Sequence, residues 1–66
     1  MIKSRLKDIM EKKGITINQL STDTGLAIET LRRARGEKIS LCRLETLKII
    51  AVALNVKIAR LFDELS

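Results

Sequence analysis

Three arginines near the middle of the chain carry its most distinctive chemistry. Arg32, Arg33 and Arg35 end the segment 17–36, which the sequence pattern divides into two short helices joined at Gly25. An arginine side chain can donate two hydrogen bonds to O6 and N7 of guanine, and its charge attracts phosphate. Two short helices hinged at a glycine, the second ending in arginines, are the layout of a helix-turn-helix that reads DNA.

The residues around these arginines predict how the two helices begin and turn. Thr16, followed three residues later by Gln19, is a capping box that would open the first helix. Gly25 lies so soon after the start of this helix that we expect the helix to end there, with a sharp turn of the backbone. In the next helix Leu31 and Ala34 are the buried pair by spacing, which leaves the arginines on the outer faces.

The remaining apolar spacing predicts three more helices. Their apolar stripes are Ile2, Leu6, Ile9 and Met10 in the first helix, Leu44, Leu47, Ile50, Ala51 and Leu54 in a helix over 44–54, and Ile58, Leu61, Phe62 and Leu65 in a last helix over about 58–64. Gly14, Gly36 and Asn55 are expected to end helices in the left-handed conformation, and residues 37–42 to form a loop tethered by Ile39 and Leu41. The expected fold class is all-α: one domain over residues 1–66, with five short helices around one core.

Composition favours a small folded domain with a polyanionic partner. The 66 residues are 45% hydrophobic and 32% charged, with a formal net charge of +5. Residues 1–14 and residues 28–43 each carry a net charge of +3, so the positive charge gathers on two segments. These two segments could form one basic face.

Several other classes of protein are excluded by what the sequence lacks. Cys42 is the one cysteine and there is no histidine, so an internal disulfide, a zinc site and Cys-His catalysis are all excluded. We expect Cys42 to be a small apolar filler, with redox sensing as the alternative. No glycine-rich phosphate loop and no apolar run of about 20 residues is present. We therefore expect no enzyme, cofactor, metal, small-molecule ligand or membrane span, and a reducing cytoplasmic location.

The order of residues along almost the whole chain resembles one known family. The matching positions are Gly14, Gln19-Leu20, Thr24-Gly25-Leu26, Thr30-Leu31, Leu44-Glu45-Thr46-Leu47, Ile50-Ala51, Ala53-Leu54, Val56 and Leu61-Phe62. This pattern is similar to that of the Cro/cI-type (xenobiotic-response-element) helix-turn-helix DNA-binding proteins, which include phage repressors. The resemblance implies a lambda-repressor-like domain with the helix-turn-helix at its second and third helices.

The resemblance also implies which residues would meet DNA. In that family the third helix lies in the major groove, and the matching base-reading positions here are Ala27, Ile28, Glu29, Arg32 and Arg33. Hydroxyls, amides and cations flanking that helix would contact phosphate: Thr16, Asn18, Gln19, Thr30, Arg35, Lys38, Ser40 and Arg43. The chain departs from the family at Ala27 and Arg43, where relatives usually carry a capping serine or threonine. Met10 and Arg35 stand where many relatives have an internal ion pair, which would leave Arg35 free for phosphate.

Two apolar residues of the helix over 44–54 lie outside its core stripe. Ile49 and Val52 occupy positions where relatives commonly carry charges. We expect a two-fold homodimer through the last two helices, with Ile49, Val52, Ile58 and Leu65 in its interface. Dimerisation would place two reading helices one DNA turn apart, about 34 Å.

The sequence thus predicts a sequence-specific regulator of transcription that binds double-stranded DNA, most simply a repressor occupying an operator. A DNA-binding antitoxin is one alternative, although the chain, which ends at Ser66, is expected to lack a tail that would wrap a toxin. A helical protein-interaction module that does not bind DNA is another. In that case the arginines would form a solvated helix face, with Glu29 paired to Arg32 or Arg33.

Overall fold

Two short strands, one at each end of the described residues, were not indicated by the sequence. The structure, a computed structural model, describes residues 2–64. Its elements are, in order, β1 (Ile2–Ser4), α1 (Leu6–Lys13), α2 (Ile17–Thr24), α3 (Ile28–Arg35), the 3-10 helix η1 (Glu37–Leu41), α4 (Leu44–Leu54), the 3-10 helix η2 (Ile58–Arg60) and β2 (Phe62–Glu64). Residues 2–64 are therefore mostly helical rather than all-α, with four α-helices and a two-stranded sheet in place of five helices.

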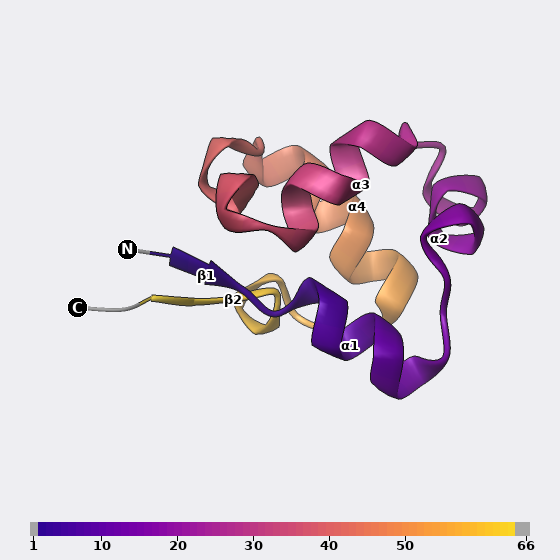
Figure 1. The fold of residues 1–66 in the computed structure, drawn as a ribbon, viewed down its shortest axis with the longest axis horizontal. Coiled ribbons are helices and arrows are strands. Elements are labelled where there is room, and N and C mark those ends of the chain that lie inside the picture. Colours follow the sequence, from indigo (N-terminus) through magenta and orange to yellow (C-terminus); the bar gives the residue numbers. More distant parts are fainter. Residues whose placement is uncertain (1, 65–66) are drawn as a thin grey trace.

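The two strands hold the ends of the chain together. They pair antiparallel, with Ile2 opposite Glu64, and Figure 1 shows them extending side by side from the helical body. Just after β1, the backbone N–H of Arg5 donates to the carbonyl oxygen of Leu61 at 2.7 Å. The segments on either side of the sheet, α1 and η2, are thereby fixed relative to each other.

The sheet corrects two helix predictions. The first helix begins at Leu6 rather than near residue 2, because the preceding residues pair with β2 and the Ser4 hydroxyl accepts a hydrogen bond from the Leu6 N–H at 3.3 Å. The helix predicted over 58–64 is a single 3-10 turn followed by a strand. The apolar spacing did identify a core residue correctly, since Leu61 is fully buried. Apolar spacing indicates which residues face the core. It does not show that a segment pairs with a strand far away in the sequence, and that pairing makes residues 62–64 a strand.

Three predicted helix ends can be compared with the backbone. Gly14 and Asn55 adopt the expected left-handed conformation, with φ of 67° and 57°. Gly36 does not, because its φ is −117° and its carbonyl oxygen accepts the first hydrogen bond of η1, from Ile39 N–H at 3.1 Å. The predicted loop over 37–42 is therefore mostly a 3-10 helix, which buries Ile39.

One apolar core joins all the helices. Its buried residues are Leu6, Met10, Leu20, Leu31, Ala34, Ile39, Leu47, Ile50, Ala51, Leu54 and Leu61. Two residues expected to face inward are exposed instead: Leu44, at 67%, and Leu41, at 75%. Leu44 begins α4 and so lies at the rim of the core, whereas Ile39 occupies the space under η1. Within residues 2–64, no helix is both long and apolar enough to cross a bilayer.

Candidate nucleic-acid interface

The turn between α2 and α3 is held by two hydroxyl side chains. Gly25 ends α2 with a φ of 75°, which a glycine adopts without strain. The Thr24 hydroxyl accepts a hydrogen bond from Leu26 N–H at 3.1 Å, and the Ser21 hydroxyl donates to the Leu26 carbonyl oxygen at 2.6 Å. Both polar groups of the residue after the glycine are thus satisfied by α2, which fixes the direction in which α3 leaves the turn.

The start of α2 presents three polar side chains to solvent. The Thr16 hydroxyl accepts a hydrogen bond from Gln19 N–H at 3.1 Å, which confirms the predicted N-cap. The cap uses this hydroxyl as an acceptor, so its own hydrogen can still be donated to a phosphate oxygen. Thr16, Asn18 and Gln19 are all exposed. The structure therefore brings these three predicted phosphate contacts together at one helix end.

One side of α3 faces the core and the other faces solvent. Leu31 and Ala34 are fully buried. At 3.6 residues per turn, positions 28, 29, 32 and 33 fall within an arc of about 140° on the opposite side. All are exposed except the half-buried Ile28. Ala27, also exposed, precedes the helix and provides no side-chain cap, as predicted.

The charged residues of this outer arc interact only weakly with each other. The Arg32 guanidinium lies 4.0 Å from the Glu29 carboxylate, and both side chains are about two-thirds exposed or more. An exposed pair at this separation contributes little to stability, typically less than about 0.5 kcal/mol. Arg33 takes part in no ion pair within residues 2–64. Both arginines can therefore reorient toward a ligand at little cost.

A polar hollow separates α3 from the start of α4. It has a volume of about 270 Å³ and is lined by Thr30, Arg33, Leu41, Cys42, Arg43 and Thr46. The structure thus joins one predicted base-reading residue, Arg33, to two predicted phosphate contacts, Thr30 and Arg43. Thr46, which sequence reasoning did not select, also lines this hollow. Only the placement of α4 against α3 could have revealed it.

The predicted phosphate contacts do not all lie in that hollow. Arg35 is half-buried, and together with Ser40 it lines a second hollow, of about 780 Å³, beside β1. The Ser4 hydroxyl of β1 donates to the Ala34 carbonyl oxygen, so the end of α3 is tied to the sheet. Lys38 is exposed on η1. The eight predicted phosphate contacts are therefore spread over the start of α2, the α3–α4 hollow and the region around η1.

Burial raises the pKa of the Cys42 thiol, an effect that the charge of Arg33 partly offsets. The sulfur lies 3.9 Å from the Lys38 carbonyl oxygen, to which the thiol donates. A raised pKa keeps the thiol protonated and unreactive near neutral pH. This environment favours the prediction that Cys42 fills space.

The four residues predicted to form a dimer interface lie in different settings. Ile49 and Val52, exposed by 39% and 72%, line a shallow hollow beside the end of α2. Ile58 is half-buried and packs against the core. Leu65 lies outside the described residues. Of the three described residues, the structure brings Ile49 and Val52 together, on the side of α4 that faces α2.

Comparison with known proteins gives two matches. A family model described as the Cro/C1-type HTH DNA-binding domain matches residues 5–63. The chain is also 42% identical over 60 residues to the SPbeta prophage-derived uncharacterized HTH-type transcriptional regulator YopO of Bacillus subtilis (strain 168), an alignment that covers 91% of this chain and 84% of that protein. No solved structure matches the chain.

Proposed function

This chain belongs to the Cro/C1-type helix-turn-helix DNA-binding family and is a DNA-binding transcriptional regulator, and we propose that it is a repressor that occupies an operator through α3. In this proposal α3 lies in the major groove of double-stranded DNA. Occupancy of a promoter would exclude other proteins from it, so repression needs no catalytic step. The matched relative, also named a transcriptional regulator, is similar to this chain over most of its own length.

The observation that carries the proposal is the outer arc of α3. Its arginines, Arg32 and Arg33, are exposed and opposite the residues that anchor the helix in the core. Arginine can bond guanine O6 and N7 together, and Glu29 could accept from cytosine N4 or hold Arg32 in position. Ala27 and Ile28, at the start of the helix, offer apolar contact to thymine methyl groups. Each good base contact would contribute about 1–3 kcal/mol of discrimination.

Phosphate contacts from both flanks would set the position of α3 in the groove. Thr16, Asn18 and Gln19 lie at the start of α2, on one side of α3. Thr30 and Arg43 lie in the α3–α4 hollow, on the other side. Arg35, at the end of α3, and Lys38 and Ser40, on η1, would add contacts from the region around η1. Contacts of this kind position a protein on DNA without selecting sequence.

We further propose that two copies associate through α4. Ile49 and Val52 are exposed on adjacent turns, and burying them against a second copy would remove apolar surface from water. A two-fold pair of reading helices would recognise a palindromic operator. Sedimentation over a concentration series tests this directly. Only monomer at high micromolar concentration would rule it out.

Salt dependence of duplex binding tests DNA binding itself. Only cations release counterions, and the proposed surface carries five of them: Arg32, Arg33, Arg35, Lys38 and Arg43. If four or five of these neutralise phosphates, affinity for a random-sequence duplex should fall about 10²- to 10³-fold between about 50 and 200 mM salt. In parallel, NMR amide shifts on duplex addition should change at the start of α2 and along α3. A protein-interaction module would give no binding, or shifts confined to other helices.

A further inference from the structure

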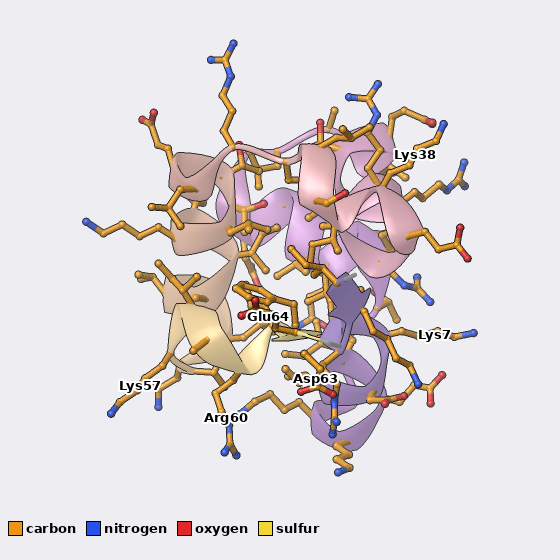
Figure 2. The ribbon with its side chains drawn as sticks, turned by 90° about the vertical axis from the view of Figure 1, so that its left-hand side faces the viewer. Lys7, Lys38, Lys57, Arg60, Asp63 and Glu64 are labelled. Atoms are coloured by element: carbon orange, nitrogen blue, oxygen red, sulfur yellow. The ribbon has the colours of Figure 1, made fainter. Side chains whose placement is uncertain are left out.

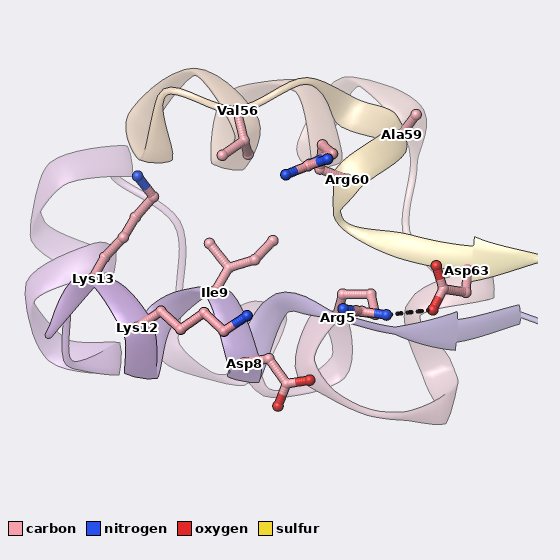
Figure 3. Close-up of a pocket in the computed structure, with 9 residues that line it drawn as sticks. All are labelled: Arg5, Asp8, Ile9, Lys12, Lys13, Val56, Ala59, Arg60 and Asp63. Carbon is pink, nitrogen blue, oxygen red and sulfur yellow. Dashed lines mark hydrogen bonds and ion pairs between the residues drawn. The ribbon is translucent and has the colours of Figure 1, made fainter.

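A second basic region lies between α1 and the C-terminal segment. A hollow of about 490 Å³ separates the two, with Ile9, Val56 and Ala59 as its apolar lining. Arg5, Lys12, Lys13 and Arg60 surround it, together with Asp8 and Asp63. Figure 3 shows Lys13 rising from α1 and Arg60 reaching in from η2, toward the space between Ile9 and Val56.

The charges around this hollow are unevenly balanced. The Arg5 guanidinium donates to the Asp63 carboxylate at 2.8 Å, so these two side chains neutralise each other at one end. The hydrogen bond to Asp63 raises the pKa of Arg5. Lys12, Lys13 and Arg60 form no ion pair within residues 2–64, and Asp8 alone opposes them. A net charge of +2 therefore surrounds an apolar floor.

Both walls of the hollow are fixed before any ligand arrives. The β1–β2 pairing and the hydrogen bond from Arg5 N–H to the Leu61 carbonyl oxygen hold α1 against η2. Ligand binding would therefore cost little backbone conformational entropy, which favours affinity. The volume lies within the range of 300–1,000 Å³ usual for small-molecule sites.

The hollow lies on the opposite side of the molecule from α3, the proposed reading helix. Figure 1 shows α3 at the upper edge of the molecule and α1 at the lower edge. In Figure 2, which keeps the same vertical axis, Lys38 of η1 lies near the top, and Lys57 and Arg60 lie at the bottom. Of the cations around the hollow, Lys13 precedes the proposed phosphate contact Thr16 by three residues, whereas Arg60 lies at the opposite edge of the molecule from Lys38. The floor of the hollow is also apolar, whereas protein–DNA interfaces are on average more polar than protein–protein interfaces.

We propose that this hollow binds a small organic anion with a short aliphatic part. A carboxylate or phosphate group would lie between Lys12, Lys13 and Arg60, which supply the donors. The aliphatic part would lie on Ile9, Val56 and Ala59 and lose its contact with water. Such a ligand would bridge the first helix and the C-terminal segment at a site separate from the DNA-reading surface.

The experiment is an NMR titration of the whole DNA-free chain with four probes. These are hexanoate and butyl phosphate, with acetate and inorganic phosphate as their head groups alone. Hexanoate should bind saturably and at least about ten-fold more tightly than acetate, because each buried methylene strengthens binding roughly four-fold. The amide shifts should map to the end of α1 and to residues 56–63. The two longer probes show whether carboxylate, phosphate or both are accepted, and saturable binding of either supports the proposal.

Two charge variants separate a site from general attraction. Lys13→Gln/Arg60→Gln removes two cations from the hollow, and Lys7→Gln/Lys57→Gln removes two exposed cations outside it. All four side chains are exposed, so both variants should keep the fold. The first should weaken hexanoate binding about ten-fold or more and the second less than about two-fold. Equal loss in both variants, shifts mapping elsewhere, or the failure of both longer probes to bind saturably and more tightly than their head groups alone would each overturn the proposal.

Discussion

Exchanging Arg33 for lysine should separate base reading from phosphate attraction. Lysine keeps the positive charge but lacks the planar guanidinium that bonds guanine O6 and N7 together. Arg33 is exposed and forms no ion pair within residues 2–64, so its replacement should change the free energy of unfolding by less than about 0.5 kcal/mol. Loss of one bidentate contact costs about 1–3 kcal/mol, equivalent to about 5- to 150-fold in operator affinity.

Arg35 is the matched control, because the same change there alters a proposed phosphate contact. Arg35→Lys should weaken operator binding less than about three-fold, since a lysine also binds phosphate as a point charge. The assay is fluorescence anisotropy at one fixed salt concentration, with an operator selected from random duplexes and with a random-sequence duplex. Neither variant should alter binding to the random duplex by more than about two-fold. The proposed roles would be wrong if Arg33→Lys kept full operator affinity. They would also be wrong if Arg35→Lys lost as much operator affinity as Arg33→Lys.

Three further predictions follow from particular contacts. Ser21→Ala leaves the Leu26 carbonyl oxygen without its donor and should destabilise the fold by about 1 kcal/mol, lowering Tm by about 4–8 °C; an unchanged Tm would show that the turn does not need this bond. Val52→Lys should abolish self-association in sedimentation experiments without unfolding the monomer; persistent dimers would place the interface elsewhere. Because burial raises the pKa of Cys42, its thiolate is depleted near pH 8.5, and iodoacetamide should react more slowly with folded than with urea-unfolded protein; equal rates would contradict this.

Local sequence signals predicted the helix-turn-helix correctly. The Thr16 cap, the sharp turn at Gly25 and the apolar spacing of α3 all depend on residues within one or two turns of each other, and all three are present in the structure. The strands were missed because their pairing joins residues 58 to 62 positions apart, from Ser4 with Phe62 to Ile2 with Glu64. No short-range pattern in either segment distinguishes a three-residue strand from a helix end.

The candidate site was predictable in composition but not in arrangement. Helical spacing places Arg32 and Arg33 opposite the buried side of α3, and the structure has them there. Sequence spacing does not show that Thr46 shares a hollow with Arg33, because that depends on how α4 packs against α3. The exposure of Leu44 was missed for the same reason, since spacing alone does not locate the rim of a core.

The most direct test of DNA reading by α3 is selection from a pool of randomised duplexes. We expect one short sequence to be enriched, as two copies in a palindrome with centres one DNA turn apart, about 34 Å, if the dimer forms. Enrichment should be lost when the selection is repeated with Arg32→Ala/Arg33→Ala. A pool that stays random with the wild-type chain, or that enriches the same sequence with the double variant, would contradict the account.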